Sequence, residues 1–528
     1  MRRWLLAGLA TIALSGSPGG RAALAQAQPS VLRVVPSADL TELDPTRGAN
    51  LVSRIYSQMV FDTLFALDSQ LRPQLLMLES SQASADGLQW TLTLRQGLRF
   101  HNGQPVTSRD VVASLQRWMG STSIGGQLKA RLASLEAVDA RQMVLTLKEP
   151  FGLVEYILAG PGAPIAAIMP EADATRPIGS PLSNPIGSGP FRFVPQERVI
   201  GHRAVFERNP DYQPRSEPAD GLAGARTVKV DRVEWIVMPD AVTAANALVT
   251  GEADIWEQVT PDLAPFLAQR RITVRRLSSL PSVTFVRPNF QLPPFNDIRA
   301  RQALALLFDQ REMLDAVAGD KVPSQPCWSF TVCGGPMSTE VGSEPYRQPD
   351  LARARALMRE AGYRGEKLVL VATPQLPVIG QMAQVVEQRL RQIGVDVDVE
   401  MMDFSAMFPR IKVQNKPIGQ GGYHLFTYYG AGAYWFHPLT NLSVDVSCPA
   451  SSWAGFPCDP EGEKLRQAFF AAPDEAARTS AYAAFHRRMW EFLPYIPTGQ
   501  FDVTSAHRRN IQGLLEAPFI AYWNIEKR

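Results

Sequence analysis

The sequence predicts a mixed α/β fold built from several packed units. The spacing of apolar residues switches along the chain between a period of two, typical of strands, and a period of 3.6, typical of helices. Residues 367–401 follow a strand–helix–strand pattern, which predicts parallel strands joined by a crossover helix. The 528 residues show no repeat of 20–50 residues, and this length suggests two or three domains.

The first 25 residues have the layout of a secretory signal peptide. Arg2 and Arg3 supply positive charge, residues 4–14 are mostly apolar, and residues 23–25 (Ala-Leu-Ala) offer a cleavage site. The apolar run is shorter than the roughly 18–20 residues that a membrane span needs. No cysteine occurs in the first 30 residues, so we do not expect a lipoprotein. We expect export to the periplasm by the Sec route, with twin-arginine export as the alternative.

A strand followed by a helix is predicted within residues 86–118. Trp90, Leu92 and Leu94 alternate with polar residues, as in a half-buried strand. Thr107 and Asp110 have the spacing of a capping box, and apolar residues follow at helical spacing.

The next clear elements lie between residues 350 and 401. Asp350 is placed to cap a helix that Gly362 ends. After a strand at 367–372, a second helix ends at Gly394, and residues 395–401 alternate as another strand. The apolar face of the second helix comprises Met382, Val386, Leu390 and Ile393.

Composition narrows the class of partner. Apolar residues make up 45% and charged residues 20% of the chain, as in a globular protein. The formal charge is +2, and removing the three arginines of the signal segment leaves −1. A nucleic-acid-binding protein usually has a basic face, so we expect no nucleic acid partner. We expect a monomer.

The four cysteines form two local pairs in the sequence. An exported protein occupies a compartment where disulfides persist, so we predict the bonds Cys327–Cys333 and Cys448–Cys458. Two other pairings stay open at this point. A zinc site is the alternative, but no histidine has ligand spacing from either pair.

Seven short segments, in order, carry a resemblance to a known family. They are Leu43-Asp44-Pro45, residues 86–103 with Trp90-Thr91-Leu92 and Phe100-His101-Asn102-Gly103, Asp110-Val111-Val112, and residues 185–191, 208–212, 251–255 and 299–304. Together they resemble the family 5 extracellular solute-binding proteins, which include dipeptide-, oligopeptide- and nickel-binding components of ABC importers. Most of these segments contain turn residues, so we interpret them as scaffold.

The resemblance implies a periplasmic binding protein-like bilobal clamp of type II with three domains. The first domain would comprise residues 26–64, 186–288 and 498–528. The second would be an insertion at 65–185, and the third would span 289–497. A small organic solute would bind between the first and third domains, the lobes would close over it, and the complex would dock on the permease subunits of the transporter. No cofactor is expected.

One aromatic segment, residues 423–438, resembles a ligand site. Aromatic residues and glycines follow each other here, and a binding cleft needs rigid apolar walls with few polar groups. An aromatic core strand is the alternative. The predicted ligand-binding residues are Arg47, Asn50, Tyr428, Tyr429, Tyr434, Trp435, Phe436 and His437. Arg47 could receive an anionic group, and His437 could hydrogen-bond a carboxylate or help to hold a metal complex.

The resemblance also implies a difference in ligand. Peptide-binding relatives carry an aspartate in this region that pairs with the peptide amino terminus. Aligning on Gly430 and Pro438 places Tyr434 at that position; a shifted alignment would instead offer Asp445 or Asp403. A buried ammonium without a carboxylate costs several kcal/mol. We therefore expect an aromatic, amphipathic or modified peptide-like ligand, and no binding of ordinary peptides through a free amine.

Other functions have weaker support in the sequence. No G-x-S-x-G elbow, His-Glu-x-x-His motif or Walker-type loop occurs, so we do not expect an enzyme. A nickel-chelate carrier would keep the family but change the ligand, with His424 and His437 as its candidate contacts, although no metal site is assigned. An ordinary peptide-binding protein of the same family is a further alternative.

Overall fold

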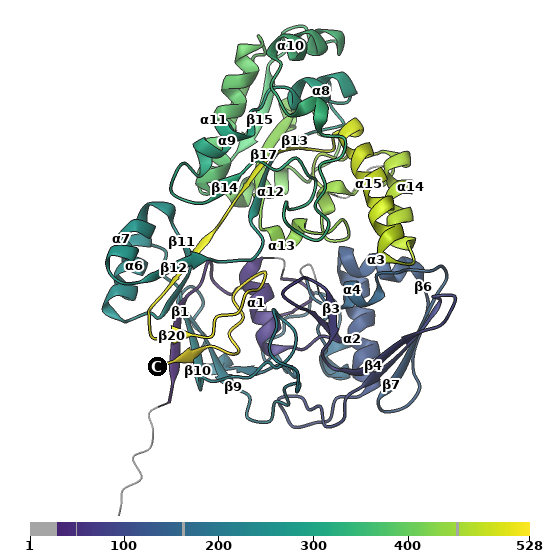
Figure 1. Ribbon diagram of the computed structural model, residues 1–528, viewed down its shortest axis with the longest axis vertical. Coiled ribbons are helices and arrows are strands. Elements are labelled where there is room, and N and C mark those ends of the chain that lie inside the picture. Colours follow the sequence, from purple (N-terminus) through teal and green to yellow (C-terminus); the bar gives the residue numbers. More distant parts are fainter. Residues whose placement is uncertain (1–28, 49, 161–163, 450–452) are drawn as a thin grey trace, which may run out of the picture.

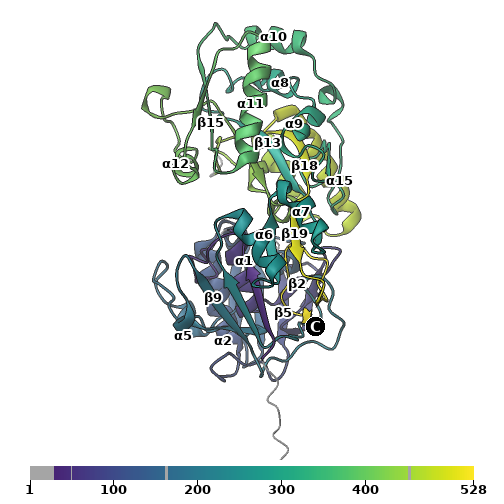
Figure 2. The ribbon, with the colours of Figure 1, turned by 90° about the vertical axis from the view of Figure 1, so that its left-hand side faces the viewer.

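The computed structural model describes residues 29–48, 50–160, 164–449 and 453–528. The predicted signal segment, residues 1–25, lies outside these ranges. Two lobes lie one above the other in Figure 2, and each is organised around its own β-sheet.

A seven-stranded sheet forms the centre of the first lobe. Its strands in spatial order are β12 (Thr273–Arg276), β19 (Thr504–His507), β11 (Ile255–Val259), β1 (Val31–Val35), β10 (Arg232–Ile236), β9 (Arg203–Arg208) and β8 (Phe191–Phe193). Strand β1 runs parallel to β10 and β11, while the other pairs are antiparallel. Its helices and minor elements are α1 (Leu51–Val60), α6 (Ala241–Thr250), α7 (Ala264–Gln269), the 3₁₀ turns η1 (Pro195–Glu197) and η2 (Pro261–Leu263), and the ribbon of β20 (Ile511–Gln512) and β21 (Glu526–Lys527).

A smaller unit, β2 to α5, packs beside this sheet and is called the inserted domain below (Figure 1). Its strands are β2 (Phe65–Leu67), β3 (Pro73–Leu75), β4 (Leu78–Ala83), β5 (Gln89–Leu94), β6 (Leu132–Ala137) and β7 (Gln142–Leu147). Its helices are α2 (Ser108–Ser121), α3 (Ser123–Arg131), α4 (Val154–Leu158) and α5 (Glu171–Ala174). The last four strands form an antiparallel sheet in the order β4-β5-β7-β6.

The sequence-based assignments in the inserted domain are confirmed. Leu92 and Leu94 of β5 are buried, whereas Trp90 is half-buried. The Asp110 carboxylate accepts a hydrogen bond from the Thr107 backbone N–H at 2.8 Å, which completes the capping box of α2.

The second lobe contains a six-stranded sheet. Its strands in order are β14 (Ser324–Gln325), β18 (Ile496–Phe501), β13 (Ser282–Pro288), β17 (Leu425–Gly430), β15 (Leu368–Ala372) and β16 (Val397–Met401). Its helices are α8 (Ile298–Ala305), α9 (Gln310–Val317), α10 (Leu351–Glu360), α11 (Pro377–Gln392), α12 (Phe404–Arg410), α13 (Gly432–Trp435), α14 (Pro460–Ala471) and α15 (Glu475–Phe492), with the turns η3 (Glu344–Tyr346), η4 (Ile418–Gln420) and η5 (Leu442–Val444).

The predicted strand–helix–strand unit is β15, α11 and β16, and the two strands are parallel. Met382, Val386 and Leu390 of α11 are fully buried, as their spacing predicts. Gly394 follows the helix with φ 81°, a left-handed conformation that glycine adopts without steric cost.

Two adjacent segments cross between the lobes. The chain passes from β12 to β13 through residues 277–281 and returns from β18 to β19 through residues 502–503. The Leu277 N–H donates to the Val503 carbonyl at 2.7 Å, so the two crossings are hydrogen-bonded side by side. A short pair of connections of this kind permits hinge motion between the lobes. The domain boundaries given above stay predictions.

Candidate ligand-binding site

A cavity of about 680 Å³ lies between the lobes. The first lobe contributes Ser37, residues 50–52 and Gln258, and the inserted domain contributes Ser123, Ile124 and Pro164. In the second lobe, α12, β17, α13 and η5 form the opposite wall of the cavity. Both crossing segments also border it. This volume is in the range of small-molecule sites, which span about 300–1,000 Å³. A solute here would contact both lobes.

Aromatic rings of the second lobe dominate one wall. Tyr428 lies within β17, with its ring centroid 6.4 Å from that of Phe408 on α12, and the two rings are stacked. Trp435 packs with its ring centroid 5.6 Å from that of the buried Phe285 on β13. Since these rings are held by the sheet and the two helices, the wall is rigid before any ligand arrives.

Gly430 explains why glycine interrupts the aromatic run. A Cβ at this position would lie 2.0 Å from Cζ3 of Trp435, a distance that atoms cannot adopt. The indole ring therefore lies directly against the backbone at the end of β17. A larger residue here would displace Trp435 from the cavity wall.

A buried cation supports Tyr434 from behind. The Arg54 guanidinium carbon on α1 is 4.3 Å from the Tyr434 ring centroid, which is a cation–π contact. Arg54 is 2% exposed, and burial lowers the pKa of its guanidinium. Because α1 belongs to the first lobe and Tyr434 to the second, this contact also joins the lobes across the cavity.

Asn50, Tyr428, Tyr429, Tyr434 and Trp435 all border the cavity. The structure therefore brings together five of the eight residues predicted from the sequence. Asn50 has a second role, because its side chain caps α1 by accepting a hydrogen bond from the Ser53 N–H at 2.8 Å.

Arg47, Phe436 and His437 do not line the cavity. Arg47 is exposed and pairs with Glu42, with 2.9 Å between Nε and Oε2. Phe436 is fully buried and His437 is 3% exposed. Residue types alone could not separate Phe436 and His437 from their neighbours, because the direction of each ring after the short helix α13 depends on what packs against it.

His437 lies in a contact between the inserted domain and the second lobe. Its ring centroid is 4.3 Å from that of Tyr156, and its Nδ1 accepts a hydrogen bond from the Leu439 N–H at 3.0 Å. Burial, and then the charge of Arg478, lowers the pKa of His437 to about 3. The imidazole is therefore neutral and part of the packing, which differs from the predicted role as a ligand contact.

This contact between the inserted domain and the second lobe is called the seam below. It is formed by Phe151, Gly152 and Tyr156 of the inserted domain with His437, Phe470 and Arg478 of the second lobe. The Arg478 guanidinium donates to the Gly152 carbonyl at 3.2 Å, and the Gly152 N–H donates to the Phe470 carbonyl at 3.3 Å. In Figure 1 the ends of α14 and α15 reach down to α3 and α4.

Sequence reasoning missed several lining residues. Phe408 and Lys412 come from α12 and the segment after it, and Trp453 comes from the loop before α14. Ile124 comes from the inserted domain. Only the folded chain brings these distant segments together, and no local pattern in the sequence marks them.

Neither alternative aspartate reaches the cavity. Asp445 pairs with Arg466 at 3.3 Å, and Asp403 is exposed and accepts a hydrogen bond from Gln375 at 3.1 Å. Among the described residues that line the cavity, Lys412 carries the single charged side chain. In the described ranges there is no group of three or more His, Cys, Asp or Glu suited to a metal ion.

A second cavity of about 430 Å³ adjoins the first at the hinge side. Gln258, Tyr429 and Val503 border both cavities. Across it, Lys321 of the second lobe forms an ion pair with Asp262 of the first lobe. Both side chains are exposed, and such pairs contribute little to stability.

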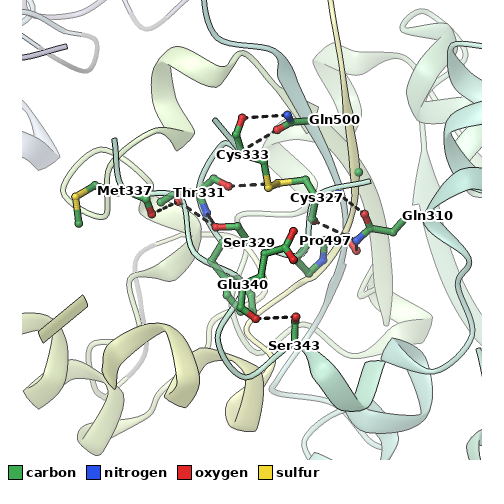
Figure 3. The surroundings of a disulfide bond; sticks show 12 residues. Gln310, Cys327, Ser329, Thr331, Cys333, Met337, Glu340, Ser343, Pro497 and Gln500 are labelled. Carbon is green, nitrogen blue, oxygen red and sulfur yellow. Dashed lines mark hydrogen bonds between the residues drawn. A yellow bond between two sulfur atoms is a disulfide. The ribbon is translucent and has the colours of Figure 1, made fainter. Parts of the chain in front are cut away.

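The two predicted disulfides are present in the structure. Cys327–Cys333 and Cys448–Cys458 join cysteines 6 and 10 positions apart. Figure 3 shows how the first loop is attached to its surroundings: Gln500 on β18 bonds both backbone groups of Cys333, at 3.0 and 3.1 Å, and Gln310 bonds the Cys327 carbonyl at 3.1 Å. The loop is thereby fixed to the strand that leads into the hinge.

Comparison with known proteins gives the class. Residues 72–453 match the family described as bacterial extracellular solute-binding proteins, family 5. A probable peptide ABC transporter periplasmic-binding protein of Sinorhizobium fredii, y4tO, is 32% identical over 493 residues, covering 93% of this chain and 92% of the relative. The glutathione-binding protein GsiB of Pectobacterium atrosepticum is 26% identical over 535 residues, covering 98% and 96%.

Solved structures share the fold. The binding protein AgaA of A. tumefacien R10, in complex with agropinic acid, aligns with a TM-score of 0.78 at 22% identity, covering 94% of this chain and 99% of that one. The Helicobacter pylori protein DppA, in complex with the peptide STSA, has a TM-score of 0.78 at 20% identity, covering 94% and 98%.

The chain belongs to the family 5 bacterial extracellular solute-binding proteins. It is the solute-binding component of an ABC transporter, and its fold is the bilobal clamp that the sequence predicts. The family is one of transport proteins and not of enzymes. In the part of the chain that the structure describes, no helix has the length and apolar character needed to cross a membrane.

Proposed function

We propose that this protein captures a peptide-like or other compact organic solute in the periplasm, holds it between the lobes against Tyr428 and Trp435, and delivers it to the permease subunits of an ABC transporter. The cavity between the lobes carries this proposal. A solute there touches both lobes, so it binds the closed clamp more tightly than the open one and shifts the population toward closure. The permease would then recognise the closed form.

The chemistry of the wall favours a ligand that is not an ordinary free-amine peptide. The cavity offers aromatic rings and hydroxyl or amide groups, but no carboxylate among its described lining residues. An ammonium group placed here would lose water without gaining a negative partner. Relatives named for peptide and glutathione binding support a peptide-like solute, and the lining favours one whose amine is absent, blocked or directed to solvent.

The test begins with the protein purified from the periplasm and native mass spectrometry of whatever compound remains bound. That compound is released, identified and titrated calorimetrically into wild type, Tyr428→Ala and Phe266→Ala. Phe266 lies on α7, away from the cavity, and serves as the matched control. We expect Tyr428→Ala to weaken binding at least tenfold and Phe266→Ala to leave it unchanged. Equal affinities for all three proteins would refute the assignment of the cavity.

Small-angle scattering provides an independent readout of the mechanism. Addition of the released compound to the emptied protein should reduce the radius of gyration, because the hinge at residues 277–281 and 502–503 lets the lobes approach. An unchanged radius at saturating ligand would refute closure.

A further inference from the structure

The charges around the cavity are unevenly distributed. Its described lining contains one cation, Lys412, and no aspartate or glutamate. The buried Arg54 adds a second positive charge directly behind the Tyr434 ring. The described lining of the cavity therefore carries a net positive charge, although the chain without its signal segment is close to neutral.

Lys412 is not held by the scaffold as its neighbour Arg410 is. The Arg410 guanidinium donates to the Gly421 and Gly422 carbonyls at 2.8 and 2.9 Å and pairs with Glu400 at 2.5 Å, so it anchors the loop after η4. Among the ion pairs of the described residues, none includes Lys412; its ammonium lies 4.1 Å from the Phe408 ring centroid.

This placement prepares Lys412 for an anion. The ring of Phe408 positions the ammonium of this exposed lysine at the cavity by a cation–π contact, and its partial burial there lowers the pKa of the lysine. A partly dehydrated ammonium gains more from an anionic partner than one in bulk water, because the local dielectric constant is lower. Phe408 also stacks with Tyr428, so the cation borders the aromatic wall.

We propose that the solute carries a carboxylate or another anionic group, which Lys412 receives while the apolar part of the solute lies against Tyr428 and Trp435. This inference rests on the proposed function and adds the charge of the solute to it. The same arrangement discriminates against cationic solutes, because a like charge near Lys412 and Arg54 is unfavourable.

Three probes that share a phenylalanyl-leucyl core and differ in charge test the inference. They are N-acetyl-phenylalanyl-leucine, which carries a carboxylate, its uncharged C-terminal amide, and phenylalanyl-leucinamide, which carries an ammonium. Each is titrated calorimetrically into wild type, Lys412→Gln and Lys416→Gln. Lys416 follows in the same loop but does not line the cavity, so it controls for a general loss of positive charge.

We expect wild type to bind the acid about tenfold more tightly than the neutral amide and to bind the cation most weakly. Lys412→Gln should bring the acid and the amide within about twofold of each other, while Lys416→Gln should retain the preference. Raising the salt concentration from 50 to 500 mM should weaken the binding of the acid to wild type and leave the binding of the amide unchanged.

The inference is overturned if the acid does not bind, if the amide or the cation binds as tightly as the acid, or if Lys412→Gln leaves the preference intact. These results are distinguishable from failure of the proposed function. Suppose that an uncharged or cationic compound co-purifies and that Tyr428→Ala weakens its binding. This result would overturn the role of Lys412 and leave the cavity as the binding site. Failure of Tyr428→Ala to weaken any bound compound would overturn the cavity itself.

Discussion

Lowering the pH should destabilise this protein through His437, the buried histidine of the seam. The ring packs 4.3 Å from Tyr156 and is 3% exposed. Burial and the nearby Arg478 keep the imidazole neutral by lowering its pKa to about 3. In the unfolded chain the same group has a pKa of about 6.5. The unfolded state therefore binds a proton in the range between these values and the folded state does not.

The magnitude follows from the two pKa values. A group whose pKa is lowered on folding contributes stability that is fully present above the unfolded pKa and is lost as the pH falls toward the folded pKa. At pH 5.0 the pH is about 1.5 below the unfolded pKa and still above the folded one. Each pH unit below the unfolded pKa lowers the free energy of unfolding by about 1.36 kcal/mol. His437 should therefore lower the free energy of unfolding by about 2 kcal/mol between pH 7.5 and 5.0.

Urea unfolding of wild type, His437→Asn and His202→Asn at both pH values isolates this contribution. Asparagine keeps an acceptor for the Leu439 N–H, while His202 is exposed and serves as the control. His101, His424 and His486 have pKa values lowered to about 4 by burial, so they add to the loss in all three proteins. Between pH 7.5 and 5.0, we expect the free energy of unfolding of His437→Asn to fall by about 2 kcal/mol less than that of the other two proteins. Equal losses would refute the reasoning.

Three further predictions concern other parts of the fold. Gly430→Ala should destabilise the protein by about 1–3 kcal/mol and shift its tryptophan fluorescence, because the new methyl would meet Trp435; unaltered fluorescence and urea midpoint would contradict this. Asp62→Asn should cost about 3–5 kcal/mol in the same unfolding assay, because it leaves the fully buried Arg226 without the carboxylate that now lies 3.0 Å away; a loss below about 1 kcal/mol would contradict it. Reducing both disulfides, whose cysteines lie 6 and 10 positions apart, should lower the free energy of unfolding by about 2 and about 3 kcal/mol respectively. Calorimetry with and without a thiol reductant checks this, and an unchanged melting temperature would count against it.

Local patterns in the sequence were enough for much of the fold. The apolar periods of residues 367–401 specified β15, α11 and β16, because a crossover helix that covers a parallel sheet must bury one stripe of its surface. The capping box at Thr107 and the local cysteine pairs depend on contacts between residues close in the chain, so the sequence alone predicted them.

The binding site was predicted in part. Tyr428, Tyr434 and Trp435 stood out because aromatic residues and glycines cluster in one segment, and all three border the cavity. Their neighbours Phe436 and His437 have the same composition signal but face the seam. Whether a ring points to solvent, ligand or core depends on partners such as Tyr156, which are hundreds of positions away in the chain.

The sequence by itself determined the family, the α/β class and the aromatic character of the site, because these depend on residue types and on spacings within short segments. Only the tertiary structure decided the charge and the outline of the cavity. In the folded protein Arg47 lies at the surface and His437 lies in the seam, whereas Lys412 lies at the cavity wall. The physical reason is that a cleft between lobes is assembled from segments far apart in the chain, and packing between those segments sets the direction of each side chain.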